Sequence, residues 1–155
     1  MQNDYHQQLI ASYEDEIGGI AYFQALTEFF TQTDQIEQLN TLVKLETQTS
    51  NALFTLIQKY NLTTKSKEHI NQKAIIEAKQ SQGKNWQELM TLFAHDFPPY
   101  VEQFQETLDL APTEDKPILQ QTVDHEIVLI EFANKELQGD STALATIEAH
   151  LKKHA

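Results

Sequence analysis

Apolar residues recur along this chain at intervals of three and four, the spacing that places side chains on one face of an α-helix. The clearest case is residues 119–137, where one stripe is formed by Leu119, Val123, Ile130, Ala133 and Leu137. Glu126 falls in the middle of that stripe. A lone carboxylate in an apolar seam is costly unless something pairs with it. The pattern therefore predicts a packed helix with an acidic residue facing its neighbours.

Two earlier segments repeat this arrangement. A first helix is predicted from an N-cap at about Asp4 to about Thr31, with Glu16 within its apolar face. A second is predicted from a cap at Asp34 to about Tyr60, with Glu46 on its apolar seam. The turn between them is very short, so the two helices are expected to form an antiparallel hairpin.

The remaining segments predict two more long helices and a short last one. A polar stretch can run back along a bundle as a crossover, which would place the third helix parallel to the second. Two adjacent prolines must break or kink that third helix, with Asp96 as a possible cap for its second half. The predicted ranges are a crossover at 61–83 with a short helix at 67–80, a third helix at 85–97 and 98–110, a fourth helix ending near Gln138, and a fifth at 141–153.

Glu16, Glu46 and Glu126 each lie near the middle of a predicted helix, so in an antiparallel bundle they reach the same height and can converge. Converging carboxylates repel one another unless a cation, protonation or hydrogen bonds neutralise them. Carboxylates on facing helices suit Fe or Mn. A polar core network with protonated carboxyls remains the alternative. His125, one residue before Glu126, points about 100° away. It is a further candidate residue of the metal site, expected either at the rim or as a group that hydrogen-bonds one of the ligands.

Length and composition bear on the number of domains and on the classes of partner that the chain can bind. The 155 residues are enough for a single domain spanning 1–155, and the formal net charge is −12 with lysine as the only strongly basic residue. This charge argues against nucleic acid and against anionic membrane surfaces. The absence of cysteine excludes disulfides and thiolate metal sites. No secretory signal or membrane span is evident, so a cytoplasmic protein is expected.

Two long helices, a long crossover, two more helices and a short fifth helix resemble the ferritin-like superfamily. The segment from Glu16 to Phe23, Glu-Ile-Gly-Gly-Ile-Ala-Tyr-Phe, is similar to the first-helix glutamate followed by an aromatic residue in ferritins and rubrerythrins. The resemblance implies an all-α four-helix bundle with a carboxylate-bridged Fe or Mn site, and redox chemistry with oxygen or peroxide or metal handling. Such families place Glu-x-x-His on the second and fourth helices. Here Thr49 and Leu129 stand at those histidine positions, which indicates an atypical or degenerate site.

A metal-free helical module acting through a homodimer or partner interface is the alternative function. The missing histidines favour it, as does a second apolar strip on the first helix formed by Tyr22, Leu26 and Phe29. Two further features are assigned structural or incidental roles. Gly18-Gly19 is expected to allow tight helix packing, and His150-x-x-x-His154 is expected to bind metals only adventitiously at a fraying terminus.

Overall fold

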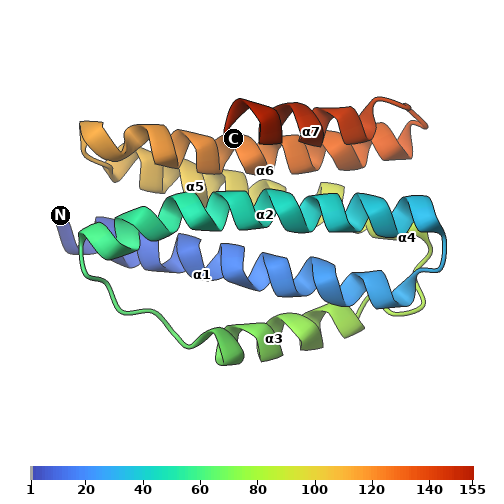
Figure 1. Cartoon of the computed structure of the whole chain (residues 1–155), viewed down its shortest axis with the longest axis horizontal. Coiled ribbons are helices and arrows are strands. Elements are labelled where there is room, and N and C mark those ends of the chain that lie inside the picture. Colours follow the sequence, from blue (N-terminus) through green and yellow to red (C-terminus); the bar gives the residue numbers. More distant parts are fainter. Residues whose placement is uncertain (1) are drawn as a thin grey trace.

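The computed structural model describes residues 2–155, with side chains described from Asp4 onward, and all the regular secondary structure in this part of the chain is helical. The all-α prediction is confirmed. Figure 1 shows helices stacked side by side along their lengths. Their bounds are α1 Gln2–Leu26, η1 Thr27–Phe29, α2 Thr33–Lys59, α3 Lys67–Lys79, α4 Trp86–Asp96, α5 Pro98–Leu110, η2 Thr113–Asp115, α6 Lys116–Leu137 and α7 Ala143–Lys153.

The helices pair in the order that their connections allow. A three-residue turn follows η1, so α1 and α2 pack as an antiparallel hairpin. Helix α3 then runs back along α1, and α4–α5 therefore run in the same direction as α2 (Figure 1). Helix α6 packs on α2, α4 and α5, while α7 lies over α6 and α2.

Several helix ends differ from the sequence-based prediction. Helix α2 starts at Thr33 after Gln32, so Asp34 lies in the first turn and is not the cap. Asp96 does not cap α5 either, since Phe97 holds the cap position without a side-chain hydrogen bond. The predicted break is confirmed, since α4 ends at Asp96 and α5 begins at Pro98. Proline fits at this position because the first turn of a helix needs no amide donor. Helix α4 begins with a capping box between Asn85 and Glu88.

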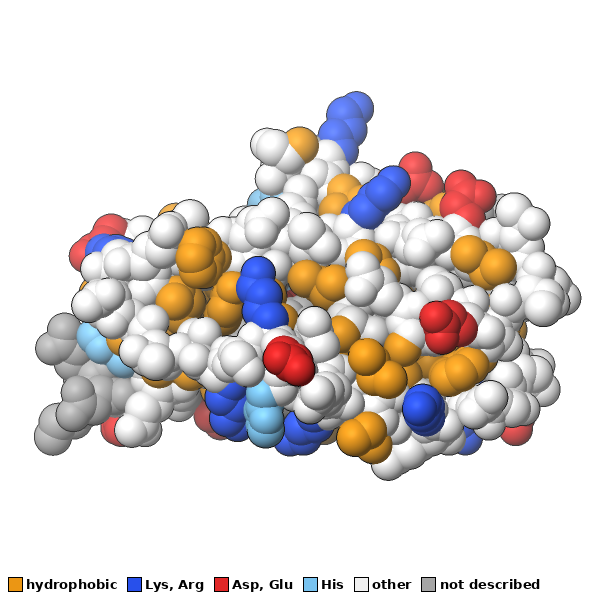
Figure 2. All heavy atoms as spheres, turned by 60° about the horizontal axis from the view of Figure 1, so that its bottom comes forward, with side chains coloured by type: hydrophobic (Ala, Val, Ile, Leu, Met, Phe, Trp, Pro, Cys, Tyr) orange, Lys and Arg blue, Asp and Glu red, His pale blue; other side chains and the backbone are white. Residues whose placement is uncertain are grey.

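The surface on the α3 side of the bundle combines hydrophobic, charged and polar side chains. Figure 2, turned to bring the α3 side forward, shows hydrophobic side chains interspersed with lysines, acids and polar groups. Helix α3 contributes two adjacent isoleucines to the surface, Ile75 and Ile76, which are 40% and 63% exposed. Across residues 2–155, no helix combines the length and the apolar character that crossing a membrane requires.

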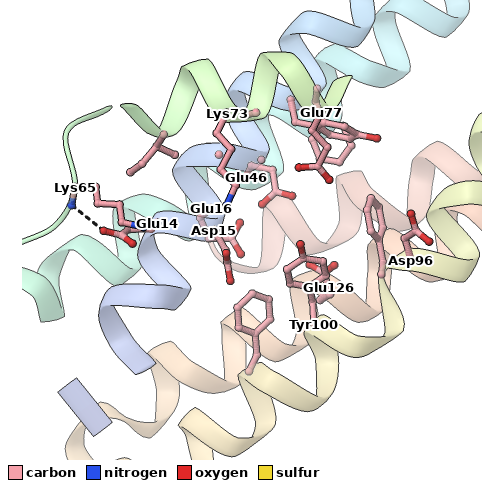
Figure 3. A pocket seen from close by; sticks show the side chains of 18 of the residues that line it. Glu14, Asp15, Glu16, Glu46, Lys65, Lys73, Glu77, Asp96, Tyr100 and Glu126 are labelled. Atoms are coloured by element: carbon pink, nitrogen blue, oxygen red, sulfur yellow. Dashed lines mark hydrogen bonds between the residues drawn. The ribbon is translucent and has the colours of Figure 1, made fainter. Parts of the chain in front are cut away.

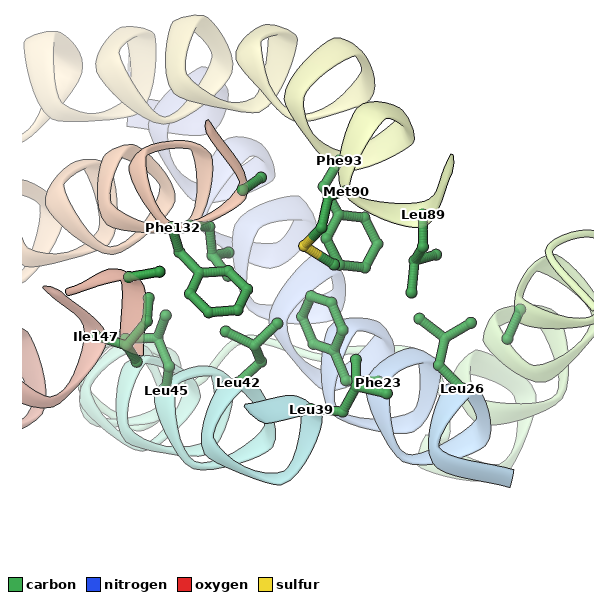
Figure 4. Close-up of a cluster of buried hydrophobic side chains, with 14 residues drawn as sticks. Phe23, Leu26, Leu39, Leu42, Leu45, Leu89, Met90, Phe93, Phe132 and Ile147 are labelled. Atoms are coloured by element: carbon green, nitrogen blue, oxygen red, sulfur yellow. The ribbon is translucent and has the colours of Figure 1, made fainter. Parts of the chain in front are cut away.

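The interior contains two hydrophobic clusters, separated along the bundle by a polar layer. The first cluster lies towards the α1–α2 turn and is shown in Figure 4; it includes Phe23, Phe93 and Phe132. The second lies towards the other end of the same helices. The strip of Tyr22, Leu26 and Phe29 packs against the first cluster, and Leu26 is completely buried. Leu26 is therefore part of the core, whereas Tyr22 and Phe29 are only partly buried against it.

Candidate metal centre

The polar layer brings together four buried side chains from three helices. Glu16 of α1, Glu46 of α2, and His125 and Glu126 of α6 are each at most 5% exposed. The Nε2 atom of His125 lies 2.8 Å from Glu16 Oε1, 3.2 Å from Glu46 Oε2 and 3.4 Å from Glu126 Oε2. The three glutamates that were expected to meet at one height do converge, and they do so around an imidazole.

The position of His125 differs from the prediction. It is not at the rim but completely buried among the carboxylates, and the alternative expectation, a hydrogen bond to a candidate ligand, is met by its Nε2 atom and Glu46 Oε2. The buried positions of α6 cover about half of its circumference, and at 100° per residue their centre is rotated about 60° from the predicted stripe. Leu129 and Phe132, which follow His125 at helical spacing, are the buried residues that show this rotation. They were the sequence signal that could have placed His125 inside.

A backbone carbonyl determines the protonation of one ring nitrogen of His125. Its Nδ1 atom bonds the carbonyl oxygen of Thr122, which can only accept, so Nδ1 carries a hydrogen. Nε2 then faces the carboxylates either as a free lone pair or with a second proton. This is how a backbone carbonyl orients a metal-binding histidine in many proteins.

The charges in this layer are strongly coupled. Burial alone would lower the pKa of His125, but the adjacent Glu46 and Glu126 carboxylates outweigh burial and raise it. Burial raises the pKa of Glu126 well above that of a free glutamate, and His125 only partly opposes this. Glu16 Oε2 is buried and accepts no hydrogen bond. A buried carboxylate oxygen without a donor is costly, so the layer holds more negative charge than its own donors satisfy.

Gly19 makes room for Glu46. A Cβ atom at Gly19 would lie 3.0 Å from the carboxyl carbon of Glu46 and 3.2 Å from its Oε1, closer than side-chain atoms normally approach. At Gly18 the nearest atom would be Ile70 Cγ2, at an ordinary 3.5 Å. The two glycines were expected to serve tight helix packing rather than a ligand pocket. Gly19 instead lets a site carboxylate rest against α1.

A cavity of about 470 Å³ leads to this layer from between α1, α3 and the α4–α5 side. Figure 3 shows labelled carboxylates entering it from all three directions. Seven acidic side chains line it against two lysines, so the cavity attracts cations. Its lining includes Glu14, Asp15, Glu16, Glu46, Glu77, Asp96, Glu126, Lys65 and Lys73.

Asp15 is a cavity residue that the sequence did not indicate. Burial raises its pKa to about 6, although a hydrogen bond from Gln103 at 3.3 Å opposes the shift. Asp15 adjoins Glu16 in the chain but lies off the apolar face of α1. It is enclosed only because α3 and α5 cover that side, and no pattern within α1 signals this.

Other residues considered from the sequence take different places. Thr49 is buried, but its hydroxyl bonds the carbonyl of Leu45 in its own helix. The ring of Tyr13 lies 5.7 Å from that of Phe54, and Tyr100 lines the cavity. Glu102 is exposed, as its position outside the apolar face predicted.

Comparisons of the chain with protein-family models, with curated proteins and with solved structures found no match.

Proposed function

We propose that this chain is an atypical ferritin-like protein that binds Fe or Mn between Glu16, His125 and Glu126, with Glu46 as a further carboxylate ligand. The observation that carries the proposal is the buried Glu16 Oε2, which has no hydrogen-bond donor in a layer already rich in negative charge. A divalent cation would satisfy that oxygen and neutralise its neighbours together.

The spacing of the ligand atoms supports a single ion. One ligand atom each from Glu16, His125 and Glu126 lies within 4.8 Å of the other two. Neighbouring ligands held at about 2.1 Å from one ion lie about 3 Å apart. The separations of 2.8–3.4 Å between His125 Nε2 and the carboxylates match that value. The donor set of imidazole and carboxylate oxygen is one that iron and manganese accept.

The arrangement of the helices supports the ferritin-like part of the proposal. The α3 crossover, the direction of α4–α5 and the short α7 correspond to the resemblance inferred from the sequence. The histidines that such families place three residues after glutamates are replaced here by Thr49 and Leu129. On this proposal His125, immediately before Glu126, supplies the imidazole from a different position on the same helix.

A bound Fe or Mn would supply redox chemistry with oxygen or peroxide, or serve metal handling. The residues of the chain contribute binding and orientation. The Thr122 carbonyl holds His125 with Nε2 towards the carboxylates, Gly19 leaves space for Glu46, and the acidic cavity guides cations inward.

The test is metal analysis of protein purified without chelator and then loaded separately with Fe²⁺ and Mn²⁺. We expect about one ion per chain, and weakening of at least about tenfold in Glu126→Gln. Glu106→Gln is the matched control, because Glu106 is exposed and does not line the cavity. It makes the same chemical substitution at a position outside the carboxylate layer. Less than about a tenth of an ion per chain after loading would contradict the proposal.

The second candidate function is a metal-free bundle acting through a homodimer. The exposed Ile75 and Ile76 of α3 favour it as an interface, and a protonated His125 could neutralise part of the carboxylate layer without a metal. Sizing chromatography with light scattering tests this function, since a strict monomer would count against it. Unchanged or increased stability of Glu126→Gln, with no ion lost, would favour it over the metal centre.

A further inference from the structure

Helix α7 carries two histidines on one face, one turn apart, outside the carboxylate layer. His150 is only 6% exposed and His154 is partly buried. The expectation that this pair lies in a fraying terminus is wrong for His150, because α7 continues to Lys153 and packs against α6 and α2. The His150 ring is therefore held by the fold, and His154 directly follows the last residue of α7.

The outer ring nitrogens of this pair lack partners. The Nε2 atoms of His150 and His154 are both buried and form no hydrogen bond. Gln48 of α2 donates to the carbonyl of Leu151 at 2.9 Å, and its own Oε1 is also buried without a partner. These are three of the six such atoms among the described side chains. Three unmatched polar atoms thus come from the last turns of α7 and from the part of α2 that packs on them.

The two rings have the separation of cis ligands on one ion. Their centroids lie 4.5 Å apart with the planes at 48°. Two imidazoles bound at about 2.0–2.1 Å and about 90° to each other would place their centroids about 4.5 Å apart. Histidines four residues apart on a helix are a recurring way to present two imidazoles to a metal.

We propose that His150 and His154 form a second metal site, through their Nε2 atoms, for late first-row divalent ions such as Ni²⁺, Cu²⁺ and Zn²⁺. The donor chemistry separates this site from the carboxylate layer. Imidazole nitrogens suit these ions, and affinity rises from Mn²⁺ towards Cu²⁺ at a given nitrogen site. The chain supplies two donors, so water completes the coordination. The site does not depend on whether Fe or Mn binds between α1, α2 and α6.

The test uses Ni²⁺ alone as the probe. Its affinity is measured by isothermal titration calorimetry, and its effect on Tm by thermal unfolding with and without the ion. The variants are His154→Gln and, as matched control, His95→Gln, whose side chain is 88% exposed on α4. Because the carboxylate layer is intact in all three chains, any Ni²⁺ that binds there contributes equally. We expect His154→Gln to weaken one Ni²⁺ site at least about tenfold and to reduce the Ni²⁺-dependent rise in Tm below that of the wild type. His95→Gln should leave both unchanged.

Equal Ni²⁺ affinity and an equal Tm shift in wild type and His154→Gln would overturn the proposal and show an adventitious ion only. His150→Gln provides a second variant, with the same loss of Ni²⁺ binding expected. His150 is buried, so circular dichroism must first show that this variant folds. If it does not fold, the more exposed His154 position decides the outcome.

Discussion

Replacement of each central glycine of α1 by alanine separates helix stability from the geometry of the candidate metal centre. Alanine is more favourable than glycine inside a helix by about 1 kcal/mol. At Gly18 the new methyl group would make an ordinary contact with Ile70 at 3.5 Å. Gly18→Ala should therefore raise the free energy of unfolding by about 0.5–1 kcal/mol and leave metal binding unchanged.

At Gly19 the same change meets Glu46. With contacts of 3.0 Å to the carboxyl carbon and 3.2 Å to Oε1, the Glu46 side chain must move by a few tenths of an ångström. Overpacking of this kind costs about 1–3 kcal/mol, which offsets or exceeds the helix gain. Gly19→Ala should therefore be no more stable than wild type, and should bind Fe²⁺ or Mn²⁺ more weakly because one carboxylate is displaced.

The assay is urea unfolding followed by far-UV circular dichroism, with metal titration of the same samples. A double-mutant cycle with Glu46→Ala isolates the contact, because removing the Glu46 side chain should restore the helix gain of alanine at position 19. If Gly19→Ala stabilises the chain as much as Gly18→Ala and binds metal equally well, the inferred role of Gly19 is refuted.

Three further predictions concern the rest of the fold. Asp115→Ala should lower the free energy of unfolding by about 2–4 kcal/mol in urea titrations, because buried Asp115 accepts hydrogen bonds from Tyr5, Tyr60 and Lys59; a loss below 1 kcal/mol would contradict this. Burial alone would raise the pKa of Asp115, but these donors outweigh it and lower the pKa. The resulting stability is present above the unfolded pKa of about 3.9 and lost as pH falls through the folded value, so Asp115→Asn should flatten the acid-side loss of stability measured between pH 5 and 2. Phe132→Ala should lower the free energy of unfolding, measured by calorimetry, by about 3–5 kcal/mol, because Phe132 is fully buried. A small loss would contradict this and would mean that neighbouring side chains fill the space that the ring leaves.

The sequence predicted the helices well because their apolar spacing and breakers are local signals. The break before Pro98 followed from such a signal, and it is observed. Convergence of the three glutamates was also predictable, because each stood alone in an apolar seam near the middle of its helix.

The predicted stripe of α6 covered only one side of its buried face, because α2, α4, α5 and α7 all pack on this helix and bury about half of its surface, including Leu129 and Phe132. His125 was therefore placed outside. Asp15 and Gly19 were missed for a related reason. The first is enclosed by other helices, and the second is needed by a side chain 27 positions further along. Such roles depend on neighbours far away in the sequence.

The site also has a temporal consequence during protein synthesis. Glu16 and Glu46 belong to the α1–α2 hairpin, but His125 follows Glu46 by 79 residues. A ribosome-bound chain will expose two acidic side chains of the layer long before the imidazole leaves the exit tunnel. At about 5–20 residues per second this interval lasts about 4–16 s. On the proposed function, the complete ligand set would therefore exist only after translation of α6, and the nascent hairpin alone would not select the metal.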